Sequence, residues 1–452
     1  MKFSEVHQKI GKYMLADGMS PVIDLDKSHG SWLVDGKTGD EYLDLFSMFA
    51  SLSVGYNHPY VLSNKERLLS SAINKPTNSD IYSIAMAEFV ETMGRVAQPD
   101  YLPHSFYVSG GSLAVENALK VAFDWKVRKN IQSGNGELGS QVLHFEKCFH
   151  GRSGYTLSLT DSPDPRKVKY FPKFDWPRVS TPSIQFPLNE ENLLKVIKKE
   201  EVAINEIKNA IIENPNDIAC MIIEPIQGEG GDNHFRPEFL SQMKEICIEN
   251  DILLVYDEVQ TGVGITGKMW AHQHFCEKSC NMDCRSHCKR IEPDIISFGK
   301  KTQCCGIFAG QRIDEVENNV FHESSRINST WGGNLVDMVR FTIYLEIIEQ
   351  ENLIEKARSH GEYLLNQLIQ IQQEHSDLVS SARGRGLFCA FDLPNSKYRD
   401  SLALDLMDNK VMVLGSGERS IRFRPHLNIK KEEIDIGIGA IRNSLNSLKI
   451  DK

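Results

Sequence analysis

The chain has 452 residues, of which 41% are hydrophobic, and its 51 basic and 61 acidic residues give a formal net charge of −10. The acidic balance argues against a nucleic-acid-binding protein, which needs a basic face, and the apolar content argues against disorder. No apolar stretch approaches the roughly 18 residues of a membrane span, and the N-terminus lacks the apolar segment of a signal peptide. We therefore expect a cytoplasmic protein of enzyme size, bound neither to nucleic acid nor to a membrane.

The predicted elements change in character along the chain. The first 60 residues hold short alternating runs, GSWLVDG and EYLDLF, that are typical of strands separated by turns. From about residue 104 to 310, apolar runs alternate with helical patterns, which predicts strands at 104–109, 141–146, 218–226, 251–259 and 295–299, and helices at 113–129 and 237–248. After residue 335 a long helical pattern reaches about residue 375, and strand-like runs and a final helix over 430–448 follow.

This order of elements predicts an α/β protein with a large and a small domain. Alternating helices and nearly continuous apolar strands indicate a mainly parallel sheet that is covered by helices on both faces. We assign residues 61–334 to the large domain, and residues 1–60 together with 335–452 to a smaller α+β domain built from both chain ends. Ligands of such sheets bind beyond the carboxyl ends of the strands, so candidate site residues are expected there.

Two candidate sites follow predicted strands. The segment Ser109-Gly110-Gly111-Ser112 leads into a helix, where glycines and unpaired helix N–H groups suit a phosphate. The alternative is a plain tight turn, which also favours glycine. Asp257-Glu258 closes an apolar strand, where carboxylates are costly unless they are partnered. A metal, a group in acid–base catalysis or a cationic ring nitrogen would serve as partner, and an ordinary strand-end carboxylate is the alternative.

Four further side chains are candidates for one kind of chemistry. Lys300 and Lys301 follow the next strand, where a desolvated lysine can act as a nucleophile unless it is a solvated loop residue. Phe149 could stack on a flat ligand and Arg152 could hold a carboxylate, although core and surface roles are the simpler alternatives. A phosphate cradle, a stacking ring, a carboxylate for a ring nitrogen and a lysine for an aldehyde are what pyridoxal 5'-phosphate requires.

The sequence resembles the class III aminotransferases, which have the type I fold of pyridoxal-phosphate-dependent transferases. The similarity extends over most of the chain and is specific, because the motifs occur in the family's order: SLSVGYNHP, FHGRSG, IIEPIQGEGG, LLVYDEVQTGVGITGK, DIISFGKK and NSTWGGN. One departure is the phosphate turn, SGGSLAVE, which is longer than in many members. It leaves open which N–H groups contact the phosphate.

The resemblance implies a role for each matching residue. Lys300 would bind the cofactor aldehyde covalently and act as the catalytic base and acid. The other cofactor-binding residues would be Asp257 at the ring nitrogen, Gln260 at the ring oxygen, Val259 and Phe149 on the two ring faces, and Gly111 and Ser112 at the phosphate. Thr330 would reach the phosphate of the neighbouring subunit, which implies a homodimer with shared active sites.

Within the family, the stretches GGSLAVENALKVAFDWK and SIRFRP are most similar to enzymes that act on the ε-amino group of L-lysine. The implied reaction transfers this amine to 2-oxoglutarate and gives 2-aminoadipate 6-semialdehyde and L-glutamate. Arg152 would bind a substrate carboxylate and Asn328 would lie near the substrate. Glu229 and Arg422 would form a switchable pair, closed with lysine and open with 2-oxoglutarate, whose second carboxylate needs a second cation.

Residues 275–292 form a cysteine-rich insert. Cys276, Cys280, Cys284 and Cys288 recur every four residues and could hold zinc or an iron–sulfur cluster, although zinc sites usually have two close pairs. The alternative is a surface excursion with reduced thiols. The rival hypotheses for the whole chain are another ω-aminotransferase, acting on ornithine, 4-aminobutyrate or a diamine, and a non-catalytic metal-binding scaffold on the same fold.

Overall fold

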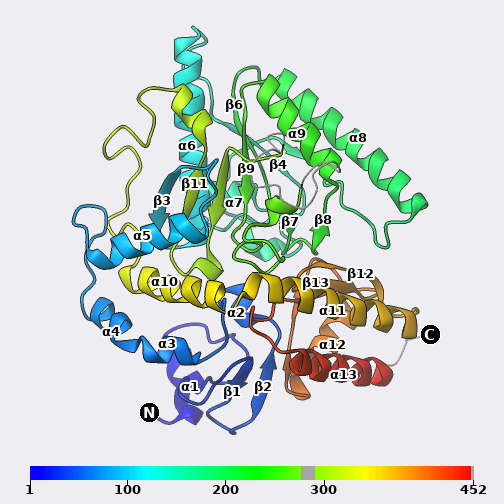
Figure 1. Ribbon diagram of the computed structural model, residues 1–452. Helices are drawn as coiled ribbons and strands as arrows, with labels where there is room; N and C mark the ends of the chain where they lie inside the picture. Colours follow the sequence, from blue (N-terminus) through cyan, green and yellow to red (C-terminus); the bar gives the residue numbers. More distant parts are fainter. Residues whose placement is uncertain (276–290, 449–452) are drawn as a thin grey trace.

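A seven-stranded sheet forms the centre of the protein, which we describe from a computed structural model for residues 1–275 and 291–448 (Figure 1). The strand order is β3-β11-β10-β9-β6-β4-β5. The bounds are β3 His104–Val108, β4 Gln141–Phe145, β5 Arg178–Val179, β6 Ile218–Ile223, β9 Leu253–Asp257, β10 Ile295–Phe298 and β11 Cys305–Ala309. The ladders from β10 to β5 are parallel, and only β11 pairs antiparallel with its neighbours, which confirms a mainly parallel sheet.

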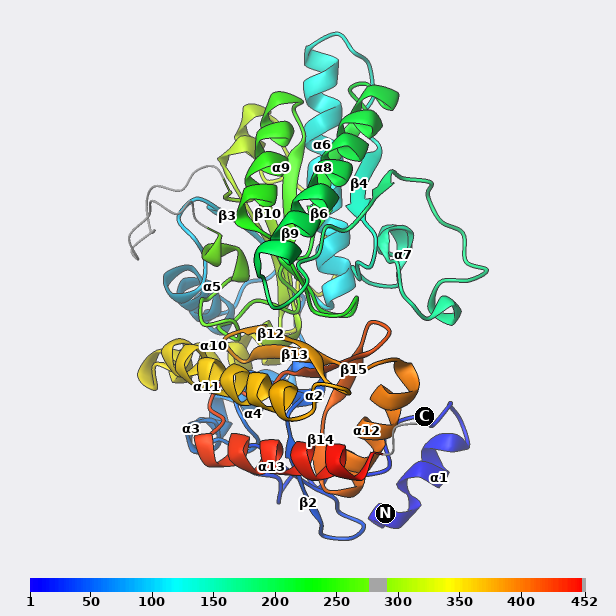
Figure 2. The same ribbon diagram turned by 90° about the vertical axis from the view of Figure 1, so that its right-hand side faces the viewer.

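Helices cover both faces of this sheet because successive residues of its buried strands point to opposite sides. On one face, α6 (Gly111–Gln132) packs on a core that includes Leu253 and Val255. On the other face, α8 (Glu190–Glu213) and α9 (Pro237–Glu249) pack on a core that includes Leu254 and Tyr256. In Figure 1 the sheet lies between α6 on its left and α8 and α9 on its right, and in Figure 2 α8 and α9 lie in front of the sheet.

The two ends of the chain meet below the central sheet in Figure 1. Strands β1 (Trp32–Val34) and β2 (Glu41–Asp44) form a three-stranded sheet with β14 (Val411–Met412). A second sheet has the order β12-β13-β16-β15, with bounds Ser380–Arg385, Phe388–Asp392, Ser420–Phe423 and Leu414–Ser416. Helices α12 (Ser396–Asp408) and α13 (Lys431–Ser447) belong to the same region. The boundaries at residues 60 and 334 stay predictions.

Three local features differ from the predicted elements. The helical pattern over 335–375 is two helices, α10 (Leu335–Gln350) and α11 (Leu353–Glu374), because Asn352 adopts a left-handed conformation with φ of 50°. The apolar run 218–226 is cut after Ile223, and Ile226 begins a separate hairpin of β7 (Ile226–Gln227) and β8 (Asn233–His234). The antiparallel β11 was not predicted, because its five-residue run, Cys305–Ala309, is short and contains a glycine, which is unfavourable in strands.

The remaining α-helices lie before β3 and after β4. They are α1 Val6–Gly11, α2 Ser47–Ala50, α3 Pro59–Ser63, α4 Lys65–Ile73, α5 Ile84–Val96 and α7 Gly154–Leu159. None of the helices in the described parts of the chain combines the length and the apolar character that crossing a lipid bilayer demands.

Candidate functional site

Asp257 and Lys300 are brought together by the parallel pairing of two strands. Asp257 is the last residue of β9 and lies opposite Ser297 of β10 in the sheet. Lys300 follows β10 by two residues and therefore emerges at the same carboxyl edge. This is the edge at which the parallel-sheet rule places ligands.

The two adjacent strand-end carboxylates have separate partners, because neighbouring strand residues face opposite sides. Asp257 is buried; its Oδ2 lies 2.8 Å from Nδ1 of His150, and its Oδ1 accepts a hydrogen bond from the Val259 N–H. Glu258 instead accepts hydrogen bonds from the ring and the backbone N–H of His272. Asp257 is thus the carboxylate that faces the candidate site, and Glu258 has a structural partner.

The buried imidazole of His150 holds the Asp257 carboxylate in place. Burial disfavours the charged imidazole, but the nearby Cys148 and Asp257 outweigh this effect and raise the pKa of His150 well above its ordinary value. Its Nε2 is buried and finds no hydrogen-bond partner among the described residues. His150 is therefore directed at Asp257, and its ring fixes the position of that carboxylate.

Lys300 and Lys301 differ in what holds their amines. The Lys301 amine is buried and donates hydrogen bonds to the carbonyl oxygens of Gln260, at 2.7 Å, and Ala50. Within the described ranges, the Lys300 amine makes no hydrogen bond or ion pair. Burial lowers the pKa of Lys300, and the Asp257 carboxylate opposes this shift. Lys300 has the free amine that a covalent bond to an aldehyde requires.

The start of α6 forms a cradle for an anion. Gly110 precedes the helix with a φ of +114°, which favours glycine, and its position opens to space rather than to neighbouring atoms. No side chain of the described chain caps this helix, so its first N–H groups are available. A Cβ at Gly111 would lie 3.0 Å from Val259 Cγ1, so this loop packs closely on the residue expected at one ring face.

Ser112, the second candidate phosphate residue, lies in the same turn. Its hydroxyl lies 2.5 Å from Ser153 Oγ and 2.7 Å from Thr156 Oγ1, which lie just before and within α7. Each hydroxyl can turn its proton toward a neighbouring oxygen. The cluster therefore offers donors beside the uncapped helix end, which fits a phosphate.

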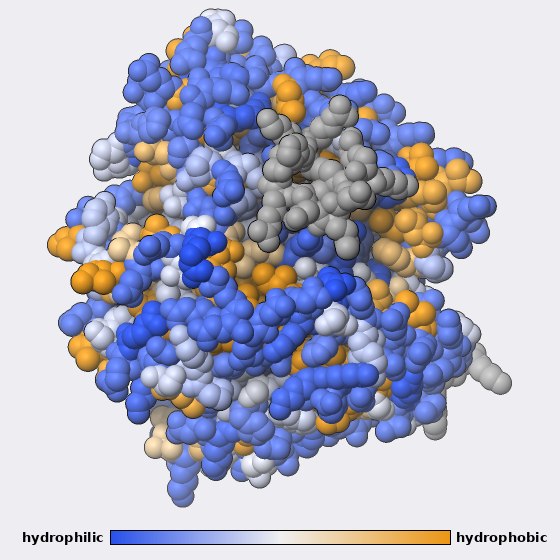
Figure 3. Space-filling view, viewed as in Figure 1, coloured by the Kyte–Doolittle hydropathy of each residue, from blue (hydrophilic) through white to orange (hydrophobic). Residues whose placement is uncertain are grey.

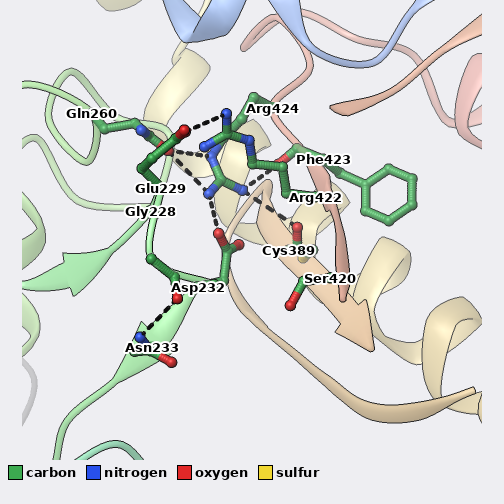
Figure 4. Close-up of polar contacts among 12 residues, drawn as sticks. Gly228, Glu229, Asp232, Asn233, Gln260, Cys389, Ser420, Arg422, Phe423 and Arg424 are labelled. Atoms are coloured by element: carbon green, nitrogen blue, oxygen red, sulfur yellow. Dashed lines mark hydrogen bonds and ion pairs between the residues drawn. The ribbon is translucent and has the colours of Figure 1, made fainter. Parts of the chain in front are cut away.

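Gln260 is oriented by a buried arginine that sequence reasoning missed. Arg424 donates from Nε and Nη2 to Gln260 Oε1, both at 3.2 Å, and pairs with Asp232 at 2.6 Å (Figure 4). Because both donors occupy the amide oxygen, the amide NH2 of Gln260 faces away from Arg424. This NH2 group can donate to an acceptor such as a ring oxygen, which fits the cofactor.

Glu229 and Arg422 form the predicted pair. Arg422 Nη2 lies 3.0 Å from Glu229 Oε2, and Figure 4 shows Glu229 reaching Arg422 from the same segment that carries Asp232. Arg422 is 6% exposed, and its Nε and Nη1 have no hydrogen-bond partner within the described chain. A buried guanidinium with unused donors is suited to a carboxylate ligand. A second cation, Lys167, also contacts Glu229, with Nζ 2.8 Å from Oε1.

Phe149 lies on the segment that leads to His150. Its backbone N–H donates to Glu224 Oε1, and the N–H of Gly228 donates to Oε2 of the same carboxylate. Burial raises the pKa of Glu224 to about 7. The buried Glu224 thereby ties the Phe149 segment to the segment that carries Glu229.

Three candidate residues make no hydrogen bond, among the described residues, to the site residues above. Arg152, Asn328 and Thr330 are exposed. Asn328 Oδ1 accepts a hydrogen bond from the Ser329 N–H, and the Thr330 carbonyl accepts one from Ser79. Their roles toward substrate and phosphate stay predictions.

The cysteine insert yields no test of a metal. Cys276, Cys280, Cys284 and Cys288 lie outside the described residues. In residues 1–275 and 291–448, no group of three or more His, Cys, Asp or Glu side chains is placed to hold a metal ion.

The site residues that sequence reasoning missed differ in whether they lie within a recognisable motif. His150 lies inside the FHGRSG motif and Glu224 inside IIEPIQGEGG, so the motifs contained them. Arg424 lies two residues after Arg422 in SIRFRP. Lys167 lies in a polar loop between α7 and β5 that offers no pattern, and only the tertiary structure reveals it.

Comparison with known proteins gives one consistent result. The sequence model of the family "Aminotransferase class-III" matches residues 14–445. The L-lysine-epsilon aminotransferase of Mycobacterium bovis is 50% identical over 444 residues, which cover 97% of this chain and 95% of the relative. The enzyme of the same name from Amycolatopsis lactamdurans is 46% identical, with 98% and 96% coverage. The structure of lysine aminotransferase from M. tuberculosis in the internal aldimine form superposes with a TM-score of 0.94 at 49% identity, covering 99% of this chain and all of that one.

Proposed function

Because the chain belongs to the class III aminotransferases, we propose that it transfers the ε-amino group of L-lysine to 2-oxoglutarate, giving 2-aminoadipate 6-semialdehyde and L-glutamate. Similarity to L-lysine-epsilon aminotransferases over nearly the whole chain supports lysine as the donor. The observation that best supports a reaction with two substrates is the Glu229–Arg422 ion pair. In this pair the Glu229 carboxylate neutralises the charge of the buried Arg422 guanidinium.

The family cofactor is pyridoxal 5'-phosphate, and the residues of the candidate site fit it. We propose that Lys300 holds its aldehyde, that Asp257 faces the ring nitrogen, and that Gln260 donates to the ring oxygen. Gly111 and Ser112 would hold the phosphate, and Val259 and Phe149 would cover the two ring faces. The bound cofactor supplies an electron-accepting ring that stabilises negative charge at the reacting carbon.

Asp257 and Lys300 have complementary tasks in this proposal. Asp257 is buried beside His150, and a carboxylate next to a cationic ring nitrogen keeps that nitrogen protonated. The Lys300 amine has no partner among the described residues and burial lowers its pKa, so its neutral form, which can accept a proton, is more accessible than in a free lysine. It would remove the proton from the substrate carbon and return it in the next step.

The charges around Arg422 explain how one site accepts two substrates. Lysine carries its carboxylate far from the ε-amine, where Arg152 would bind it, and Glu229 would neutralise Arg422 meanwhile. 2-Oxoglutarate has a carboxylate at each end, so its second carboxylate would take the unused donors of Arg422. Asn328 would contact the substrate between these ends.

A homodimer with shared sites is part of the proposal, and Thr330 would reach the phosphate of the neighbouring subunit. Large apolar side chains lie exposed on and around α4 and α5, among them Leu69, Ile73, Ile81, Tyr82 and Ile84, each at least 53% exposed. Figure 3 shows apolar surface at the edge where these helices lie. Such a patch is typical of a protein–protein interface. Light scattering of the purified protein would give the mass of a dimer.

A donor panel tests the proposed function. Purified protein loaded with pyridoxal phosphate is mixed with 2-oxoglutarate and L-lysine, L-ornithine or 4-aminobutyrate, and glutamate formation is followed. The cyclised semialdehyde is trapped with 2-aminobenzaldehyde. We expect lysine to be the fastest donor. A faster ornithine or 4-aminobutyrate reaction would favour the other ω-aminotransferases, and no reaction with any donor would favour the non-catalytic scaffold.

A further inference from the structure

Glu229 is shared between two cations. Its Oε1 lies 2.8 Å from Lys167 Nζ and its Oε2 lies 3.0 Å from Arg422 Nη2, so each oxygen serves a different partner. Burial alone would raise the pKa of Glu229, but Arg422 and Lys167 outweigh it and lower the pKa. The carboxylate therefore remains ionised, and the trio carries one net positive charge.

Of this trio, Lys167 lies close to the ring of Phe149. It is the last residue of a short 3-10 turn, Pro165–Lys167, and its Nζ is 5.8 Å from the centroid of the Phe149 ring. The side chains of Lys167 and Glu229 are 28% and 25% exposed, whereas that of Arg422 is 7% exposed. Lys167 is thus the more accessible of the two cations that Glu229 contacts.

We propose that Lys167 is the positioning residue that holds Glu229 when 2-oxoglutarate takes Arg422, an inference that rests on the proposed function. A substrate carboxylate on Arg422 must displace Glu229 Oε2. A largely buried carboxylate without a partner is costly, because it is removed from water and has no compensating charge. Lys167 already binds the other oxygen of Glu229, so the carboxylate keeps a partner throughout the exchange.

This arrangement makes the two half-reactions unequal in their need for Lys167. With lysine bound, Glu229 stays on Arg422 and the contact with Lys167 is dispensable. With 2-oxoglutarate bound, Glu229 has lost its contact with Arg422 and keeps its contact with Lys167. Lys167 accordingly sets selectivity for the dicarboxylate acceptor. If Lys167 instead bound the lysine carboxylate directly, its loss would impair the lysine half-reaction.

The test compares Lys167→Met with Lys169→Met, which removes an exposed lysine from the same loop. Each half-reaction is followed separately by absorbance in single-turnover mixing with L-lysine or with 2-oxoglutarate. In steady-state assays of Lys167→Met we expect the KM for 2-oxoglutarate to rise about tenfold, the equivalent of about 1.4 kcal/mol, with kcat changed less than twofold, and in single turnover we expect the lysine half-reaction to change less than twofold. Lys167→Arg should restore the wild-type KM, and Lys169→Met should leave both half-reactions unchanged.

A binding measurement separates this effect from turnover. Calorimetry with glutarate, a dicarboxylate that lacks the reacting keto group, should show about tenfold weaker binding to Lys167→Met than to the wild type. Equal changes in both half-reactions, a slower lysine half-reaction alone, or unchanged glutarate affinity would overturn the inference. If wild-type protein did not react with lysine at all, the proposed function would fail instead, and glutarate binding would still report on Lys167.

Discussion

The imidazole of His150 and the carboxylate of Asp257 form a buried pair, with Nδ1 of His150 2.8 Å from Oδ2 of Asp257. The two residues belong to different parts of the sheet: His150 lies in the segment that follows β4, and Asp257 is the last residue of β9. The pair fixes the carboxylate that we expect at the ring nitrogen of the cofactor. Its removal should therefore affect how tightly the cofactor binds.

The substitution His150→Ala should weaken binding of pyridoxal phosphate by at least tenfold. A hydrogen bond to a charged group contributes roughly 1.5–3 kcal/mol, and the Asp257 carboxylate would lose its contact with the His150 imidazole. Equilibrium dialysis of the cofactor against the purified variant measures the change. An unaltered affinity in a variant that keeps the wild-type melting temperature would show that His150 has no part in positioning Asp257.

Lys300→Ala and Lys301→Ala should have different consequences. Loss of Lys300 should abolish the covalent link to the cofactor and lower turnover by on the order of 10²–10⁴-fold, because it removes the proton-transferring group. Loss of Lys301 should keep the link but lower stability, since its amine bonds the Gln260 and Ala50 carbonyls. Borohydride reduction followed by peptide mass spectrometry locates the modified lysine. A label on Lys301 in the wild type would reverse the assignment.

Glu229→Ala should separate the two half-reactions. Without Glu229, the buried Arg422 keeps its charge beside the amine end of lysine, and like charges repel, so the lysine half-reaction should slow by about tenfold or more. The 2-oxoglutarate half-reaction should change little, because its carboxylate itself neutralises Arg422. Rapid mixing of the loaded enzyme with each substrate measures both rates. A change by the same factor in both would show that Glu229 does not switch.

The reactivity of Lys300 should depend on pH in a defined direction. Burial lowers the pKa of its amine from the ordinary 10.5, so the neutral, nucleophilic form is more abundant at pH 8 than in a free lysine. The rate at which cofactor-free protein binds pyridoxal phosphate covalently should therefore reach its half-maximal value below pH 10.5. Nα-acetyl-lysine under the same conditions is the control. A midpoint at or above that of the free amine would contradict the lowered pKa.

Two helix glycines should respond oppositely to the same substitution. In α11, a Cβ at Gly361 would lie 1.9 Å from the Gly386 carbonyl carbon, so Gly361→Ala should destabilise the protein by about 1–3 kcal/mol. In α13, a Cβ at Gly439 would meet no atom within 4 Å, so Gly439→Ala should stabilise it by about 0.5–1 kcal/mol. Denaturant unfolding of both variants measures the difference, and equal effects would contradict the close approach of α11 to Gly386.

Much of the central sheet was predictable from local patterns. The strands that end at Asp257 and Phe298 are apolar runs bounded by polar residues, and the helices that follow β3 and precede β9 have regular apolar stripes. The break at Asn352 and the antiparallel β11 were not predictable. A single left-handed residue leaves the apolar period intact, and a five-residue strand between two others is stabilised by its neighbours rather than by its own sequence.

The amino-acid sequence by itself determined which chemical groups this protein carries and at which strand ends they lie, because apolar periodicity and short motifs are local properties. Only the tertiary structure decided which groups meet. Asp257 contacts His150 across 107 residues, Arg424 contacts Gln260 across 164 and Lys167 contacts Glu229 across 62. Such pairings depend on how strands and loops distant in the chain are packed side by side, and no local pattern encodes that arrangement.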